Sequence, residues 1–193
     1  ENFRFITSPH LTPALLAAKI EIVLTDLVQI SRLGEKKRPE NERFRKYLKS
    51  HNWIEKHFKR IAENVEEQID CLECANCCRV ATAKVTERDV QKLAKFLGVK
   101  PHVVVRDYTI EDPDEGHILK RDDATGCVFL SGNECTVYDA RPSSCELFPH
   151  VVKGEGSIQT RMWQFIDRAC YCPIVYNTLE AWKEETDFSP TPK

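Results

Sequence analysis

Four cysteines near the middle of the sequence are the residues whose type and spacing point most directly to chemistry. Cys71, Cys74, Cys77 and Cys78 form the pattern Cys-x2-Cys-x2-Cys-Cys. Bacterial ferredoxins use this spacing for three ligands of an iron–sulfur cluster, with a remote fourth ligand. Zinc sites also use Cys-x2-Cys, but they normally pair two such knuckles to reach tetrahedral coordination. Because no second Cys-x2-Cys pair follows, the spacing favours iron–sulfur over zinc.

The remaining cysteines raise the alternative of a disulfide-bonded scaffold. They are spread through the second half of the sequence as Cys127, Cys135, Cys145, Cys170 and Cys172. A chain of 193 residues can bury a core without covalent staples, and nine is an odd number. Adjacent cysteines also rarely suit separate disulfides, since each bridge needs a partner at a specific Cα separation. We therefore expect free thiols that bind metal.

Several segments in the same order resemble one known family. The spacing at 71–78, the segments Gly-Cys-Val-Phe-Leu (126–130) and Cys-Thr-Val-Tyr (135–138), and Arg-Pro-Ser-Ser-Cys-Glu-Leu-Phe-Pro (141–149) are similar to those of the CxxCxxCC family. These YkgJ-type cysteine-cluster proteins are described as zinc- or iron-chelating domains. The short helix expected from Thr86 to Gly98 also matches. The resemblance covers about residues 71 to 150, and the helical N-terminal region lies outside it.

The resemblance implies a set of metal ligands and a cofactor. The implied ligands are Cys71, Cys74, Cys77, Cys78, Cys127, Cys135 and Cys145, and Cys170 and Cys172 compete for an eighth place. Cys172-Pro173 is similar to the Cys-Pro of ferredoxins. Seven or eight thiolates exceed the four that one cluster or one zinc ion needs, so either two centres exist or some cysteines are structural. The implied cofactor is an iron–sulfur cluster of the 4Fe-4S type, with zinc as the alternative.

Two arginines are the candidates for groups that contact this cofactor. Clusters bound by thiolates accumulate negative charge, so positive side chains are expected around them. Arg79 follows the first cysteines directly, and Arg141 precedes Cys145 by four residues. For Arg141, a structural role at a strand-to-helix corner is an equal alternative. No catalytic residue is assigned.

Three functions from different classes follow. The first is an iron–sulfur or iron-binding protein with a redox or catalytic-support role. The second is a structural zinc module that presents a basic helix to a nucleic-acid or protein partner. The third comes from the resemblance alone: one branch of the family contains flagellin lysine N-methylases, which use S-adenosylmethionine. The sequence carries no Gly-rich methyl-donor fingerprint, so this activity is not transferred and enzymatic function stays open.

The elements that position the cysteines predict an α+β fold. Apolar spacing predicts a helix over 14–33 that ends at Gly34, a polar link over 35–39 and a second helix over 40–69, which together form an antiparallel hairpin spanning 1–69. A cysteine-rich metal-binding domain follows over 70–176. Within it we expect short helices at 86–97 and from Pro101, antiparallel strands at 117–120, 127–130, 135–138 and 158–165, and a helical turn carrying Cys145. A C-terminal helix and tail occupy 177–193.

Charge and hydropathy narrow the location and the partners. The net charge of −2 gives no global signal for nucleic acid or a membrane surface, and no apolar run approaches the ~20 residues of a membrane span. Thiols that stay available for metal favour a reducing cytoplasm. The chain begins at Glu1 rather than methionine, so a preceding segment stays open. Positive residues crowd 36–60, either as a solvated helix face or as a docking strip for nucleic acid or an acidic protein.

Overall fold

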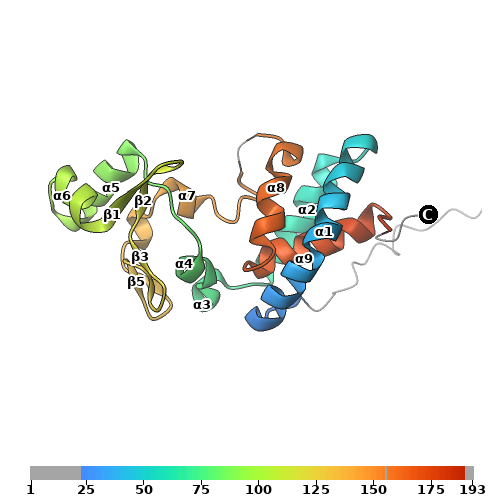
Figure 1. Cartoon of the computed structure of the whole chain (residues 1–193), viewed down its shortest axis with the longest axis horizontal. Coiled ribbons are helices and arrows are strands. Elements are labelled where there is room, and N and C mark those ends of the chain that lie inside the picture. Colours follow the sequence, from blue (N-terminus) through green and yellow to red (C-terminus); the bar gives the residue numbers. More distant parts are fainter. Residues whose placement is uncertain (1–22, 155, 190–193) are drawn as a thin grey trace, which may run out of the picture.

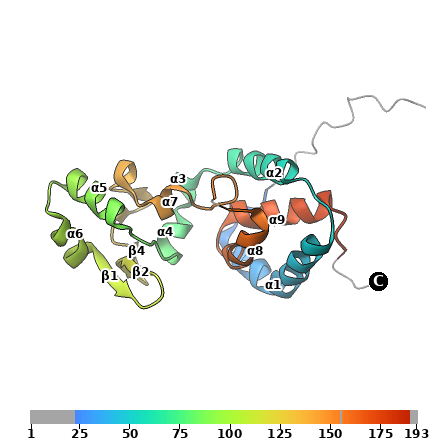
Figure 2. The same ribbon diagram turned by 90° about the horizontal axis from the view of Figure 1, so that it is seen from above.

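The computed structural model of the protein describes residues 23–154 and 156–189, which form two lobes joined end to end (Figure 1). The helical lobe contains α1 (Leu27–Ser50), α2 (Glu55–Glu67), α8 (Ile158–Arg168) and α9 (Pro173–Glu185). The cysteine lobe contains α5 (Glu87–Leu97), α6 (Pro101–Tyr108), the strands and α7 (Ser143–Glu146). The short helices α3 (Cys71–Cys74) and α4 (Asn76–Val80) lie where the lobes meet, as the view from above also shows (Figure 2). The first half of the helix predicted over 14–33 lies outside the described residues.

The helical lobe is built around Trp182 of α9, which is almost fully buried. Its indole contacts the ring of Phe58 on α2, with centroids 4.4 Å apart, and the ring of Phe44 on α1, with centroids 5.2 Å apart. Phe165 and Met162 of α8 complete the same core. Helices from the two ends of the described chain therefore share one hydrophobic core, with the cysteine lobe inserted between them in sequence.

Helix α1 corrects the predicted boundary of the first helix. It runs without a break through Gly34 and Pro39, and the chain leaves the helical conformation only at residues 51–54. Gly34 stays helical because its bare α-carbon faces the chain between α8 and α9. A Cβ there would lie 2.5 Å from the Ala169 carbonyl oxygen. Glycine is therefore used here for close packing, and the link predicted over 35–39 is wrong.

The cysteine lobe has its own, smaller core. Helix α5 (Glu87–Leu97) begins at the capping box of Thr86 and Asp89 and ends at Gly98, and α6 (Pro101–Tyr108) begins at its proline, both as predicted. The strand β1 (Thr109–Asp112) pairs with β2 (Gly116–Leu119) in antiparallel register. Side chains from these helices and from the following loops fill the core, including those of Val90, Leu93, Val104, Leu119, Phe129 and Val137.

The strands near the later cysteines are very short. β3 (Arg121–Asp122) pairs with β4 (Gly126–Cys127), and β5 (Leu130–Ser131) pairs with β6 (Glu134–Cys135). A 3₁₀ turn, η2 (Tyr138–Ala140), and the single helical turn α7 (Ser143–Glu146) follow. Two-stranded pairs of this length have little stability of their own in water. Their arrangement must therefore depend on neighbouring contacts or on a bound metal.

The segment at 158–165 was predicted as a strand and is a helix, α8. Ser157 caps it by accepting a hydrogen bond from the Thr160 amide. Ile158, Met162, Phe165 and Ile166 are all buried, and their spacing of three and four residues places them on one helical face. Despite this correction the fold is α+β, as predicted. Among the described residues, no helix is both long enough and apolar enough to cross a membrane.

The Gly34 contact gives a prediction with a diagnostic sign. Gly to Ala inside an exposed helix normally stabilises by about 1 kcal/mol. At Gly34 we expect Gly34→Ala to lower the free energy of unfolding by ~1–3 kcal/mol, because the added methyl group overlaps the backbone of Ala169. Urea unfolding followed by circular dichroism measures the change. Ser31→Ala, on an exposed part of the same helix, is the control; a stabilised Gly34→Ala variant would contradict the close approach.

Candidate metal centre

The first cysteines lie on two helical turns joined by a sharp bend. Asp70 caps α3 by accepting a hydrogen bond from the Leu72 amide at 2.8 Å. Cys71 and Cys74 are three residues apart in α3, so their side chains share one face. Ala75 then adopts a left-handed conformation with φ of 44°, which turns the chain into α4. Cys77 and Cys78 follow within α4.

A remote cysteine joins these residues from the helical lobe. The Asn76 side-chain amide donates a hydrogen bond to the Tyr171 carbonyl at 2.7 Å and so ties the bend to the start of α9. This contact brings Cys172 next to Cys71 and Cys74. Burial raises the pKa of the Cys172 thiol to about 12, and negative charge on Cys71 or Cys74 would raise it further. Cys172 therefore has the first cysteine segment as its neighbour.

Three later cysteines, Cys127, Cys135 and Cys145, also lie near α4. Gly126 of β4 packs against the backbone of α4, where a Cβ would lie 2.9 Å from the Cys78 carbonyl oxygen. This contact places Cys127 beside Cys78. Cys135 lies opposite Leu130 in the β5–β6 pair. Burial raises the pKa of the Cys145 thiol to about 12, with Cys127, Cys78 and Cys135 as its neighbouring thiols.

A cavity of about 240 Å³ opens between these segments. Six cysteines line it: Cys71, Cys77, Cys78, Cys127, Cys135 and Cys145. All nine cysteines are free thiols. Within the ranges that the structure describes, no three Cys, His, Asp or Glu side chains converge closely enough to hold a metal ion as they stand. The cysteine side chains therefore line a cavity and do not converge on one metal position.

The neighbouring thiols of Cys77 and Cys78 shift each other's pKa in opposite directions. A hydrogen bond from the Cys77 thiol lowers the pKa of Cys78 to about 7, and the nearby Arg79 guanidinium also favours the Cys78 thiolate. The same hydrogen bond and burial raise the pKa of Cys77. Metal binding needs thiolates, so a metal bound by these residues would displace the protons of the Cys77 and Cys78 thiols.

Comparison with known families decides what this cysteine arrangement is. Residues 70–173 match the model of the CxxCxxCC family, whose description is "Putative zinc- or iron-chelating domain". The match spans more than half of the chain and includes all nine cysteines. The chain belongs to this family. No curated protein and no solved structure gives a significant match. Family membership supports chelation of zinc or iron by the CxxCxxCC domain.

Arg79 of the CxxCxxCC domain holds the ligand loops together. Its guanidinium donates to the Cys74 carbonyl at 3.2 Å and to the Gly132 carbonyl at 3.0 Å, and it also bonds the Asn133 side chain. Asn133 in turn donates to the Glu73 carbonyl at 2.8 Å. These bonds fasten α3 to the β5–β6 turn. The Arg79 guanidinium thus makes observed contacts with the neighbouring loops. Its contact with a cofactor stays a prediction.

Arg141 lies at the edge of the cavity beside Cys135. Its guanidinium sits 3.8 Å from the centroid of the Tyr138 ring and donates to the Tyr138 carbonyl at 2.9 Å. Burial raises the pKa of the Cys135 thiol, and the positive charge of Arg141 opposes that rise. Arg141 thus combines the structural role at the corner with a position that favours a thiolate.

Two positioning residues of the CxxCxxCC domain, Asn76 and Arg168, were missed in the sequence. Asn76 carries the contact to Tyr171, and a single Asn between cysteines gives no pattern from which to infer this. Arg168 is substantially buried beside Tyr171 and Cys172, and its guanidinium donates to the Pro149 carbonyl at 3.3 Å. Burial lowers its pKa, while the neighbouring Tyr171 and Cys172 raise it. The contacts of Arg168 join residues that are distant in the sequence or carry no motif, so only the structure shows them.

Cys170 lies apart from the other eight cysteines. It is buried against α1, where its thiol donates to the Ile166 carbonyl at 3.6 Å. Burial raises the pKa of this thiol to about 12, and its charged neighbours are Arg38, Glu35 and Asp167 rather than other cysteines. Of the two residues that compete for an eighth ligand position, only Cys172 therefore lies among the cysteines.

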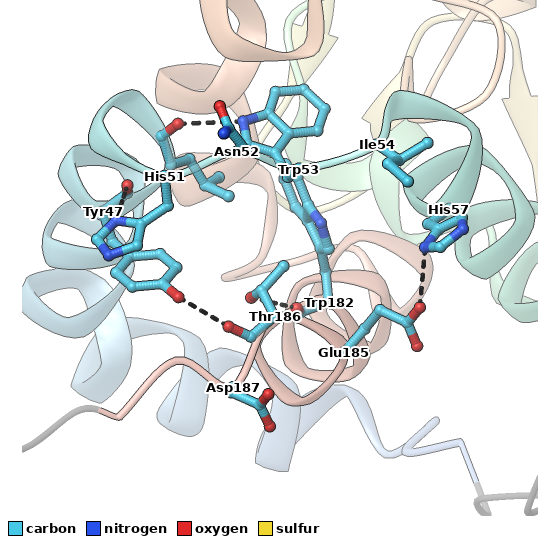
Figure 3. A pocket seen from close by; sticks show the side chains of 11 residues that line it. Tyr47, His51, Asn52, Trp53, Ile54, His57, Trp182, Glu185, Thr186 and Asp187 are labelled. Carbon is cyan, nitrogen blue, oxygen red and sulfur yellow. Dashed lines mark hydrogen bonds and ion pairs between the residues drawn. The ribbon is translucent and has the colours of Figure 1, made fainter.

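A second cavity, of about 280 Å³, lies in the helical lobe between the end of α1 and the end of α9 (Figure 3). Several of the polar groups that line it are hydrogen-bonded or ion-paired. Tyr47 donates to the Thr186 carbonyl at 2.8 Å, and His57 Nδ1 lies 3.1 Å from Glu185. These contacts hold the α1–α2 connection against α9. We therefore assign this cavity a structural role.

At least five of the ten Lys and Arg side chains in the basic segment at 36–60 form ion pairs with carboxylates. The pairs are Lys37 with Glu180, Arg38 with Glu35 and Asp167, Arg45 with Glu42, Lys59 with Glu55, and Arg60 with Glu185. The positive charge seen in the sequence is therefore partly offset on this face. A protein or nucleic-acid partner for this segment stays a prediction.

Asp89 links α5 to the turn that carries Cys145, and its removal tests this link. Its carboxylate accepts hydrogen bonds from the Ser143 amide at 2.9 Å and from the Thr86 amide at 2.9 Å. We expect Asp89→Ala to lower the free energy of unfolding by ~1–3 kcal/mol, because two backbone amides lose the buried carboxylate that accepts their hydrogen bonds. Hydrogen exchange at the Ser143 amide measures the local effect. Exposed Arg88→Ala is the control, and unchanged exchange at Ser143 would refute the link.

Proposed function

We propose that this chain is an iron–sulfur protein in which Cys71, Cys74, Cys77 and Cys172 bind a [4Fe–4S] cluster. The observation that carries the proposal is the Asn76–Tyr171 hydrogen bond, which brings a remote Cys-Pro to a Cys-x2-Cys-x2-Cys loop. Three ligands from one loop and a fourth from a distant Cys-Pro is the combination that ferredoxin-type clusters use. A zinc site would instead be expected to pair two knuckles of similar spacing.

The surroundings of these four cysteines suit a negatively charged iron–sulfur cluster. Cys172 and Ala75 are buried, so the centre would be shielded from water on the side of the helical lobe. Arg168 lies beside Cys172 and places a buried positive charge next to the thiolates. Such groups beyond the ligands stabilise thiolate-bound clusters and tune their potential. The role that follows is redox chemistry or support of catalysis.

Zinc is the alternative metal, because the family description includes it. In that case the four thiolates would hold one tetrahedral ion and the role would be structural. The ligand residues are the same in both proposals. Only the inorganic content differs, so a direct measurement separates them.

The test is the inorganic content and colour of anaerobically purified protein. We expect a broad visible absorption that bleaches with dithionite, and about four iron atoms with equal acid-labile sulfide per first centre. Cys172→Ser should remove the iron, the sulfide and the absorption of this centre, whereas Cys170→Ser should retain them because Cys170 lies away from the cysteine loop. Colourless protein that contains zinc and no sulfide would overturn the iron–sulfur proposal.

A further inference from the structure

We infer that Cys78, Cys127, Cys135 and Cys145 form a second, separate four-thiolate centre that binds a thiophilic metal. This inference goes beyond the first cluster and does not depend on the metal bound there. It rests on the contacts that bring Cys127, Cys135 and Cys145 to Cys78 and on the cavity that all four cysteines line.

The two centres would divide the adjacent residues Cys77 and Cys78 between them: Cys77 belongs to the first centre and Cys78 to the second. Cys77 and Cys78 are neighbours in α4, and successive side chains of an α-helix project about 100° apart. The two thiols are nevertheless hydrogen-bonded to each other, so the division rests on the other cysteines that lie near each of them. Cys172 lies among the thiols that influence Cys77, whereas Cys127, Cys135 and Cys145 each have Cys78 as a neighbour.

The second set is brought together by backbone contacts. Gly126 lies against the backbone of Cys78 and Arg79, and a side chain at that position would overlap both. Arg121, which pairs with Cys127 across β3 and β4, donates to the Val80 carbonyl at 2.9 Å and so fastens this strand pair to the end of α4. The β4 strand is therefore held where Cys127 and Cys78 are neighbours.

Cys135 and Cys145 reach the same place from two further segments. The Thr136 amide donates to the Phe129 carbonyl at 2.9 Å and closes the loop between Cys127 and Cys135. Asp89 and the Ser144 hydroxyl, which donates to the Lys84 carbonyl at 2.8 Å, fix the turn that carries Cys145. Four ligands thus come from four separate segments, and four thiolates are enough to close a tetrahedral site.

The remaining features agree with this division. The cavity of about 240 Å³ is lined by all four cysteines of the second set and also by Cys71 and Cys77 of the first set, with Arg141 at its edge, so the two centres would be adjacent. Arg79 lies beside Cys78 and Arg141 beside Cys135, so both arginines predicted from sequence serve this second set. The eight cysteines near the junction form two sets of four, and Cys170 is left outside both. No ligand needs to be shared.

Metal and sulfide stoichiometry of the full wild-type chain tests the second centre without any substitution. After anaerobic loading with iron and sulfide or with zinc, we expect two centres per chain. These would be two clusters, one cluster and one zinc ion, or two zinc ions. Sulfur coordination of each metal, measured by X-ray absorption, should involve four thiolates at each zinc ion. One centre per chain at saturation would overturn the inference, even if that centre is a [4Fe–4S] cluster.

Matched cysteine variants test which residues belong to which centre. Cys145→Ser should lose one of the two centres and keep the other, and Cys172→Ser should lose the opposite one. Cys170→Ser should keep both. Circular dichroism confirms that each variant is folded. If Cys145→Ser and Cys172→Ser, both folded, lose the same centre, the assignment is refuted. Two zinc ions and no sulfide would refute the proposed cluster but support two separate centres, so the two proposals fail independently.

Discussion

Burial of thiols at the junction of the two lobes is the constraint on which the rest of the structure depends. A thiol that loses contact with water resists ionisation, and burial raises the pKa of Cys71 to about 11 and that of Cys145 and Cys172 to about 12. Metal binding reverses this preference, because a bound cation stabilises the thiolates and displaces their protons. The free energy of metal binding then becomes part of the free energy of folding.

The two lobes depend on metal to different degrees. The helical lobe has a core of aromatic and aliphatic side chains around Trp182, and no metal is needed to explain its packing. The cysteine lobe has a smaller core, and β3 to β6 are only two residues long each. Its segments are connected by small groups of side-chain hydrogen bonds, such as those of Arg79 and Asp89. Loops of this kind gain most from a centre that ties four of them together.

Local signals in the sequence predicted much of the fold, and long-range packing accounts for the errors. The capping box at Thr86 and Asp89 and the proline at the start of α6 mark true helix starts, because they act on neighbouring backbone groups. Gly34 was mistaken for a helix end since the sequence cannot show that Ala169 lies against it. The segment at 158–165 was mistaken for a strand, although Ile158, Met162 and Phe165 follow helical spacing once their shared core is known.

The candidate site shows the same limit. Cysteine type and spacing identified the first loop, but neither the contact of Asn76 with Tyr171 nor the isolation of Cys170 has a sequence pattern. Cys172 lies at the start of α9, the helix that carries Trp182 into the helical core. A metal bound by Cys172 and by the α3–α4 loop would therefore connect the two lobes directly. Loss of that metal would then remove a contact between the lobes as well as a cofactor, and the helical lobe would act as the support for ligands that lie in the short helices α3 and α4.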